Sequence, residues 1–385
     1  MPNRKHGMSR RSWVKTVGAG GVVALAGCSG SSGSSSDSDS EGSTAGGTNS
    51  ELTEVNITLA PSGFQGIMMD HITEDTDILA NAMEAAGYQA NVQRSWEGAA
   101  LFAAGGPDIS TMSSLEAARL GAERDVDLAV FGKAAPLFKG MWVARGGPYD
   151  PESTGSAQAT IDSIVEDEAT MGIGSWAGGE IPGHMAAFSS EFDTTFSQEQ
   201  SDFDVVTADY AAIPQLILDG DLAIGDASPV HGVARNLDEN GTPQHREVFN
   251  CAEILESNDI GIPLLNSLTT NQSFIEDNRG AAAAFLQAWH EGMAWLFEDP
   301  IGRIMMDEEN HFEQLAISTE SQAQYIVDWG INMEMDNEYP IVYQDQELDD
   351  SFISADRGFI NRVAELGVAP ESWEDNVVYE KLEQS

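Results

Sequence analysis

Cysteine is scarce in this chain of 385 residues. It occurs twice, as Cys28 and Cys251. Cys28 belongs to a short N-terminal segment with its own features, so the body of the protein holds a single thiol. A disulfide within that body is therefore excluded. Cys251 has no neighbouring nucleophile motif, and we expect it to be a small buried hydrophobic residue.

Basic residues are also few. Eighteen lysines and arginines stand against 63 acidic residues, which gives a formal net charge of -45. Only five of the basic residues are lysine, and five of the eighteen precede Cys28. Because a phosphate backbone requires basic clusters, nucleic acid is excluded as a partner.

The acidic residues are spread along the whole chain. Molar salt shortens the screening length to about 3 Å and relieves the self-repulsion of such a surface. We therefore interpret the chain as halophilic. An acidic substrate site is the alternative, and the even spread of the acids disfavours it.

Patterns that carry catalysis or metal binding are missing. The seven histidines show no HExxH or paired metal spacing, and no Walker or dinucleotide-binding glycine pattern is present. His184 and His231 fall near loops that matter below, but isolated histidines are more often structural. We predict no enzyme, no cofactor and no metal site.

The N-terminus carries export signals. Arg10 and Arg11 precede an uncharged run over 16–27, which resembles a Tat signal. That run is too short to span a bilayer as a permanent helix. It ends in Leu-Ala-Gly-Cys at 25–28, which matches a lipobox, the site at which cleavage leaves a lipidated cysteine. We predict a signal peptide over 1–27 and lipid attachment at Cys28.

The Ser- and Gly-rich residues 28–50 have the composition of a flexible tether. Export and anchoring together place the protein on the outer face of the cell membrane.

From residue 51 onward, strand and helix patterns alternate. The expected strands are 55–59, 89–96, 108–112, 126–131, 169–174, 204–207, 222–225 and 247–250. The expected helices include 99–104, 115–122, 160–166, a stretch ending near 188, 212–218 and 279–297. Turns at 61–66 and 146–148 interrupt the series. Such alternation is typical of mainly parallel sheets covered by helices, here in two series followed by a helical tail.

Four segments resemble the substrate-binding proteins of nitrate, sulfonate and taurine type ABC importers and the related thiamine-precursor binders. They are 104–110 (AGGPDIS), 173–179 (IGSWAGG), 217–223 (ILDGDLA) and 271–288, which opens with NQSFIEDN. The resemblance covers about residues 54–300. It departs from the family at Arg279, where a proline is usual, and at 161–166, where a lysine-rich run is usual.

The resemblance implies an α/β, type II periplasmic-binding-protein fold. Two lobes would be joined by crossovers near 140–144 and 263–268. Lobe 1 would comprise 51–141 plus 265–385, and lobe 2 would comprise 142–264. A solute would be held between the lobes, which close by hinge motion. The resemblance also implies ABC permease subunits as partners of a monomeric receptor.

Ligands in α/β sheets bind at the carboxyl ends of strands. Four turns occupy such positions, and their candidate ligand-binding residues are Phe64, Gln65, Ser113, Ser114, Trp176, Gly178, Gly179, Asp226 and Ser228. Consecutive glycines allow close approach of the backbone. Each functional interpretation has an alternative. Ser113 and Glu116 have capping-box spacing, Trp176 suits a core, and Asp226 suits a solvated turn.

No lysine or arginine lies in these four turns. An anionic ligand would depend on amides and hydroxyls, so the sequence favours a neutral or aromatic solute, such as a pyrimidine-type vitamin precursor. Two other functions stay open. One is a sensory binding lipoprotein that signals to a membrane transducer, and the other is an enzyme on the same fold.

Overall fold

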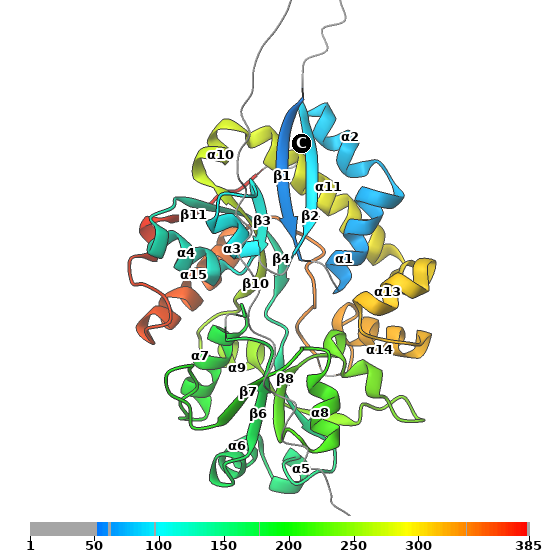
Figure 1. Cartoon of the computed structure of the whole chain (residues 1–385), viewed down its shortest axis with the longest axis vertical. Coiled ribbons are helices and arrows are strands. Elements are labelled where there is room, and N and C mark those ends of the chain that lie inside the picture. The colour runs from blue at the N-terminus through cyan, green and yellow to red at the C-terminus, as the bar shows by residue number, and fades with distance from the viewer. Residues whose placement is uncertain (1–51, 61–62, 96–97, 177, 336, 383–385) are drawn as a thin grey trace, which may run out of the picture. The chain divides into compact units, whose positions relative to one another are not determined.

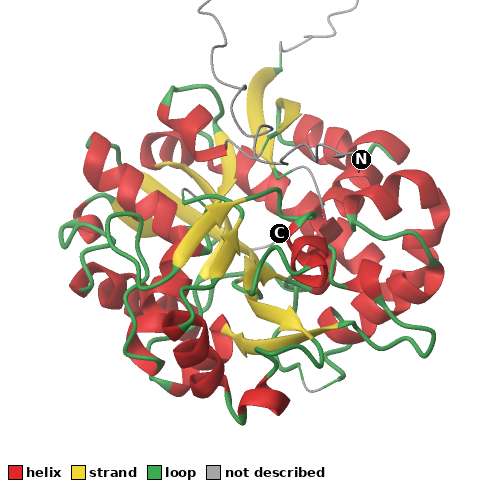
Figure 2. Ribbon diagram, turned by 60° about the horizontal axis from the view of Figure 1, so that its bottom comes forward, coloured by secondary structure: helices red, strands yellow, loops and turns green. Residues whose placement is uncertain are grey.

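A computed structural model describes residues 52–60, 63–95, 98–176, 178–335 and 337–382. These residues belong to one compact unit, which is built from two sheets with flanking helices (Figure 1). Figure 2 shows the helices packed around the strands of this unit. The predicted signal peptide, the tether over 28–50 and lipid attachment at Cys28 lie outside the described residues.

The larger sheet has six strands in the order β11-β4-β10-β3-β1-β2. Their bounds are β1 Thr53–Leu59, β2 Tyr88–Arg94, β3 Ile109–Met112, β4 Leu128–Pro136, β10 Leu264–Asn271 and β11 Val377–Tyr379. β1 runs parallel to β2 and β3, and β11 runs parallel to β4. β10 is antiparallel to both of its neighbours.

Strand β4 shows how this sheet divides two apolar clusters. All nine of its residues are buried, as expected of a strand covered on both faces. Ala129 and Phe131 pack in one cluster, whereas Leu128 and Val130 pack in the other. The alternation follows from the two-residue period of a strand.

Different helices cover the two faces of the larger sheet. The first cluster includes α1 Gly63–Asp70, α2 Ile78–Ala85 and α11 Arg279–Glu298. A π-helix, His71–Asp75, joins α1 to α2. The second cluster includes α3 Gly98–Ala103, α4 Ser114–Arg124 and α15 Asp350–Glu365.

The smaller sheet has five strands in the order β7-β6-β8-β5-β9. Their bounds are β5 Gly140–Ala144, β6 Thr170–Ile173, β7 Asp204–Thr207, β8 Ile224–Ala227 and β9 His245–Asn250. β6 is parallel to β7 and β8, while β5 is antiparallel to β8 and β9. The accompanying helices are α5 Pro151–Thr154, α6 Ala157–Glu166, α7 Ile181–Glu191, α8 Ile213–Asp219 and α9 Cys251–Ser257.

The chain passes between the sheets through residues 137–139 and 258–263. The amide of Leu137 donates to the carbonyl of Pro263 at 2.9 Å and ties the two passages together. The crossovers expected at 140–144 and 263–268 overlap strands β5 and β10 instead. The division into lobes at residues 141 and 264 remains a proposal.

The C-terminal region is mainly helical, with α10 Gln272–Asp277, α12 Pro300–Ile304, α13 Glu308–Gln314 and α14 Glu320–Gly330 before α15. It also supplies the edge strand β11, which was not expected from the sequence. Three residues are too few to show a strand period, and β11 forms because Val377–Tyr379 can pair with β4.

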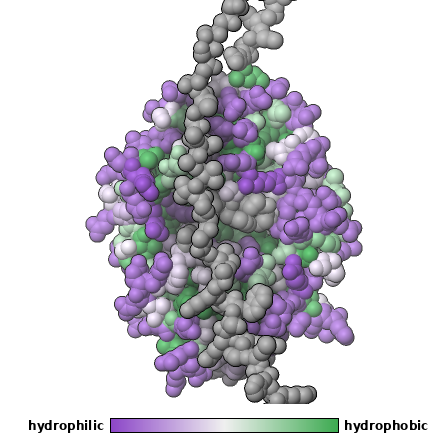
Figure 3. Space-filling view, viewed as in Figure 1, coloured by the Kyte–Doolittle hydropathy of each residue, from purple (hydrophilic) through white to green (hydrophobic). Residues whose placement is uncertain are grey.

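The surface seen in Figure 3 is largely hydrophilic, in keeping with the acidic composition. No helix among the described residues is long and apolar enough to cross a membrane.

Candidate functional site

Polar side chains gather at the carboxyl ends of β6, β7 and β8. The residues of this polar cluster are Lys139, Glu180, His184, Tyr210, Asp226, Ser228, His231 and Cys251. Glu180 follows β6, Tyr210 follows β7, and Asp226 lies in β8. Lys139 reaches the cluster from the 137–139 crossover. This edge of a parallel sheet is where α/β proteins bind ligands.

Lys139 is the centre of the charged network. Its Nζ lies 3.3 Å from Oδ2 of Asp226 and 3.5 Å from Oε1 of Glu180. It also lies 3.6 Å from the centre of the Tyr210 ring, whose hydroxyl donates to Glu180. Lys139 and Glu180 are each 3% exposed, and Asp226 is fully buried. Buried charges persist only when they are paired in this way.

The pKa values in the cluster follow from this pairing. Burial alone would raise the pKa of Asp226, but Lys139 and His184 lower it well below its usual range. Burial and the neighbouring Lys139 lower the pKa of His231 to about 3. Burial and the nearby Glu180 carboxylate raise the pKa of Tyr210 well above its usual value. At neutral pH, therefore, Asp226 is ionised while His231 and Tyr210 are neutral.

Cys251, His184 and Asp226 form a chain that resembles a nucleophile, base and orienting acid. Cys251 Sγ lies 2.7 Å from His184 Nδ1, and His184 Nε2 lies 3.3 Å from Asp226 Oδ1. All three side chains are fully buried, and burial raises the pKa of the Cys251 thiol.

The backbone around Cys251 also argues against catalysis. Its amide donates to the carbonyl of Lys139, and the amide of Ala252 donates to Asn250. Neither amide is left to stabilise an oxyanion. The chain of three side chains is therefore best understood as part of the packed interior, and the expected burial of Cys251 is confirmed.

The turn between β6 and α7 requires glycines because neighbouring side chains leave no room for a Cβ atom. A Cβ at Gly174 would overlap the ring of Tyr210, and one at Gly178 would overlap the carboxylate of Glu180. A Cβ at Gly179 would lie 3.2 Å from both Ser113 Oγ and Glu116 Oε2. Gly178 and Gly179 thus allow a close approach, as the sequence suggested. The groups that approach here are side chains of the protein itself.

Ser113 and Glu116, at the start of α4 on the larger sheet, lie next to this turn of the smaller sheet. Ser113 caps α4, its hydroxyl accepting from the amide of Glu116 at 3.0 Å. The carboxylate of Glu116 accepts in return from the amide of Ser113 at 2.8 Å. The predicted capping box is confirmed. Burial and the facing Glu180 raise the pKa of Glu116, although hydrogen bonds from Ser113 to its carboxylate lower it.

The remaining candidates have varied surroundings. The hydroxyl of Ser114 donates to Asp356 at 2.7 Å, and that of Ser228 lies 2.7 Å from His231 Nδ1. The ring of Trp176 lies 5.0 Å from that of Phe196, at an interplanar angle of 34°. Asp226 is fully buried rather than part of a solvated turn.

Phe64 and Gln65 lie in the first turn of α1, where a turn over 61–66 was expected. α1 already begins at Gly63, because Phe64, Ile67 and Met68 form an apolar helical face that packs in the core. Phe64 is thus a core residue. Gln65 is 5% exposed, and its Oε1 has no hydrogen-bond partner among the described residues.

Sequence reasoning missed Lys139, Glu180 and Tyr210 as members of the site. The four turns do lack basic residues, but the crossover at 137–139 contributes Lys139 to the polar cluster. The sequence offers only a weak indication of Lys139. This lysine directly follows a mainly apolar stretch, 128–138, where a charge needs buried partners.

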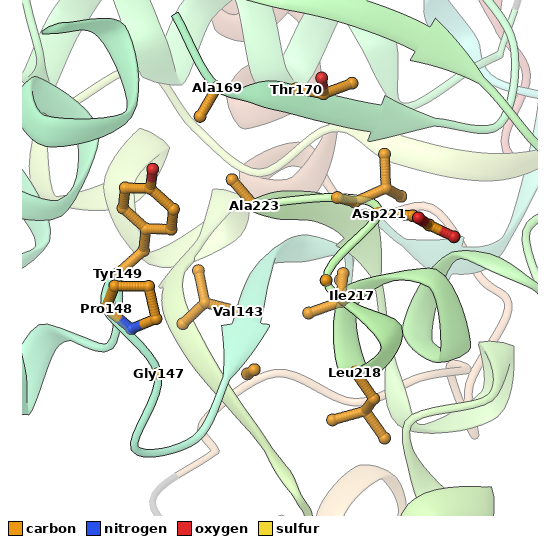
Figure 4. A pocket seen from close by; sticks show the side chains of 13 residues that line it. Val143, Gly147, Pro148, Tyr149, Ala169, Thr170, Ile217, Leu218, Asp221 and Ala223 are labelled. Atoms are coloured by element: carbon orange, nitrogen blue, oxygen red, sulfur yellow. The ribbon is translucent and has the colours of Figure 1, made fainter. Parts of the chain in front are cut away.

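A cavity of about 390 Å³ lies elsewhere in the smaller sheet. Val143, Tyr149, Thr170, Ile217 and Ala223 are among the residues that line it (Figure 4). Thr170 begins β6 and Ala223 precedes β8, so the cavity lies at the amino ends of these strands, whereas the polar cluster lies at their carboxyl ends. Among the residues that the structure describes, no group of three or more His, Cys, Asp or Glu side chains could hold a metal ion.

Glu247 on β9 predicts a pH effect on stability. Burial, aided by Glu253, raises the pKa of Glu247 to about 8. The folded protein keeps this proton until about pH 8, whereas the unfolded chain loses it near pH 4.3. Stability should therefore fall as the pH rises from about 5 to 8. The change Glu247→Gln should remove this part of the fall.

Urea unfolding at pH 5, 6.5 and 8 and constant salt measures the effect. Glu54→Gln, at an exposed position of β1, is the matched control and should parallel the unmodified protein. Parallel pH profiles for Glu247→Gln and the unmodified protein would contradict the assignment.

No family model matches the sequence, and no curated protein sequence matches it either. Similar folds do occur among solved structures. The alkanesulfonate-binding protein SsuA from Xanthomonas axonopodis pv. citri, bound to MOPS, is 11% identical, with a TM-score of 0.59 over 86% of this chain and 100% of that chain. The nitrate-binding protein NrtA from Synechocystis PCC 6803 is 11% identical, with a TM-score of 0.53 over 85% and 86% of the two chains.

A third similar structure is a Candida albicans gene product described as having the generic periplasmic binding protein structural fold. It is 12% identical, with a TM-score of 0.54 over 87% of this chain and 99% of that chain. At such identities the likeness speaks for the fold alone. It confirms the predicted α/β architecture: this chain, with its two sheets and flanking helices, has the periplasmic-binding-protein fold.

Proposed function

We propose that the protein is an extracytoplasmic receptor that binds a small solute and delivers it to an ABC importer. The observation that supports this most directly is the polar cluster at the carboxyl ends of β6, β7 and β8. Facing it is the capped start of α4, which comes from the other sheet. Binding proteins of this fold, such as SsuA and NrtA, are named for small solutes.

The electrostatics of the cluster favour a neutral or cationic solute over an anion. Both carboxylates around Lys139 already neutralise it, and the Tyr210 ring covers it. The capping box at the start of α4 occupies the amides of Ser113 and Glu116. A bound anion would also meet Glu116 and Glu180. A solute that donates hydrogen bonds or carries a positive charge fits this surrounding better.

The proposed contacts with the solute come from Ser113, Trp176, Gly178, Gly179, Asp226 and Ser228. Gln65 joins them because its buried Oε1 still lacks a donor. Phe64 and Ser114 would support the site without touching the solute. Phe64 packs in the apolar core, and the hydroxyl of Ser114 donates to Asp356.

Mass spectrometry of small molecules that co-purify in high salt tests the proposal. We expect one class of solute, and we expect its addition to the emptied protein to raise the melting temperature. If no solute co-purifies and none of a broad panel raises the melting temperature, the receptor assignment fails. Turnover of the compound would favour an enzyme. Binding without a permease partner would favour a sensory lipoprotein.

The proposed anchor makes a separate prediction. Replacement of Cys28 by serine should move the protein from the membrane fraction to the soluble fraction, because the acyl chains would have no attachment point. Fractionation followed by immunoblotting measures this. Continued membrane association of Cys28→Ser would contradict lipid attachment at this residue.

A further inference from the structure

Three Asn-x-Ser/Thr sequences occur in the chain. They begin at Asn56, Asn240 and Asn271, and none has proline in the middle position. This pattern is the acceptor for N-linked sugars in secreted proteins. Because the pattern is short, its surroundings decide whether a glycosyltransferase can use it. The properties that matter are the exposure of the asparagine and the freedom of the backbone around it.

The sequence at Asn56 lies within β1, which is paired with β2 on one side and with β3 on the other. Asn56 Oδ1 accepts from Asn91 Nδ2 at 2.9 Å. Thr58 is fully buried, and its hydroxyl accepts from Gln93 Nε2 at 2.6 Å. A transferase could therefore reach this sequence only if β1 left the sheet.

The sequence at Asn271 spans the junction between β10 and α10. Asn271 is partly buried and pairs with Leu128 of β4. The amide of Gln272 donates to the carbonyl of Asp127 at 2.9 Å, and its side chain donates to the carbonyl of Leu128 at 3.3 Å. This backbone is held on the sheet, so it cannot bend into the active site of a second protein.

The third sequence, Asn240-Gly241-Thr242, lies in a turn between β8 and β9. Asn240 and Gly241 are exposed, and Thr242 is partly exposed. Gly241 has a φ of 78°, and a Cβ atom added to it would meet no atom within 4 Å. The space around the tip of the turn is therefore open, and Asn240 can be approached from the solvent.

Hydrogen bonds fix the base of this turn. The carboxylate of Asp238 accepts from the amides of Asn240 and Thr242 at 2.8 and 2.9 Å. The amide of Asp238 donates to the carbonyl of Thr242 at 2.8 Å, and Leu237 pairs with Pro243. The Asn240 side chain also interacts with Asp238, but this carboxylate is fully exposed, so water can replace that contact. The folded protein thus presents Asn240 and Thr242 together on its surface.

We propose that Asn240 is a site of N-linked glycosylation. Nδ2 of Asn240 forms a bond to the anomeric carbon of a sugar that is carried on a lipid phosphate or diphosphate. The bond between that carbon and the phosphate oxygen breaks, and the phosphate leaves with the electron pair. The amide nitrogen gives one of its two protons to a base of the transferase. No atom is oxidised or reduced.

The proposal rests on the proposed function only in that it requires export. A Tat-type signal exports protein that is already folded, so the transferase would meet the folded surface. All three sequences lie within the described residues, and that at Asn240 combines an exposed asparagine with an open turn. The fold therefore selects Asn240 over Asn56 and Asn271.

Peptide mass spectrometry of the full chain, purified in high salt from membranes of its native host, tests the site. We expect the peptide with Asn240 to gain the mass of one or more sugar residues, and those with Asn56 and Asn271 to gain none. Asn240→Gln and Thr242→Val should lose the sugar, whereas Thr242→Ser keeps the hydroxyl and should retain it. Ser273→Ala, at an exposed position, removes the sequence at Asn271 and is the matched control. It should keep the sugar on Asn240.

A sugar-free Asn240 in protein from the membrane fraction, with its side-chain amide intact or hydrolysed, would overturn the proposal and leave the receptor function standing. Sugar on Asn56 or Asn271 would overturn the selection of Asn240 by the fold. A protein that carries the sugar on Asn240 but binds no solute would refute the receptor function alone.

Discussion

Replacement of Lys139 by methionine is expected to lower the free energy of unfolding by about 3–5 kcal/mol. Methionine has a similar length but no charge. The change leaves the carboxylates of Asp226 and Glu180 buried without the cation that lies 3.3 and 3.5 Å from them. His184 remains beside Asp226, but among the residues that the structure describes Glu180 would keep only the hydroxyl of Tyr210 as a side-chain partner. Urea unfolding at constant salt measures the loss.

Lys133→Met is the matched control. Lys133 is also a largely buried lysine, but its carboxylate partner, Asp349, is exposed and lies 3.9 Å away. Water can satisfy Asp349 when the lysine is lost, so we expect a change of about 1 kcal/mol or less. Equal losses for the two variants would show that Lys139 does not organise buried charge in the way described.

The change Gly174→Ala should disrupt the proposed solute site. The new methyl group would overlap the ring of Tyr210, so the ring must move away from the turn. It would then lose its bond to Glu180 and its cover over Lys139. We expect a loss of about 1–3 kcal/mol in stability, as for other overpacked sites, and at least tenfold weaker solute binding.

Gly280→Ala is the control for this change. Gly280 lies near the start of α11, and a Cβ there would meet only Tyr88, at an ordinary distance of 3.7 Å. Alanine in a helix should be neutral or slightly stabilising. Melting temperature and solute affinity of both variants give the comparison. Unchanged solute affinity in Gly174→Ala would show that Tyr210 does not belong to the solute site.

Much of the architecture could be predicted because it depends on local patterns. The strand expected over 204–207 is β7, and the helix expected over 279–297 is α11 with one further residue. Spacing of apolar residues and turn-forming glycines determines such elements within a few positions. The capping box of α4 belongs to the same class, since Ser113 and Glu116 are three residues apart.

The site itself could be predicted only in outline. The rule that ligands bind at the carboxyl ends of strands pointed to turns that lie together in the structure, among them those at Gly178 and Asp226. It could not indicate Lys139, because its partners Glu180 and Asp226 follow it by 41 and 87 residues. Their meeting depends on how β5, β6 and β8 are ordered in the sheet. The order of the strands cannot be predicted from the local sequence.

The same limit applies to the C-terminal region. Nothing near Asp356 reveals that Ser114 and Tyr379 will donate to it, because these residues come from three separate elements. The region therefore seemed to be a helical appendage. In the structure it packs on the larger sheet, with α14 in the first apolar cluster and α15 in the second.

Quantification of bound solute is the most direct test of a receptor with its site at the polar cluster. The unmodified protein, Gly174→Ala and Gly280→Ala would be purified in high salt, and the solute released from each would be measured by mass spectrometry. We expect close to one solute per chain for the unmodified protein and for Gly280→Ala, and little or none for Gly174→Ala. Equal solute in all three proteins, or none in the unmodified protein, would contradict this expectation.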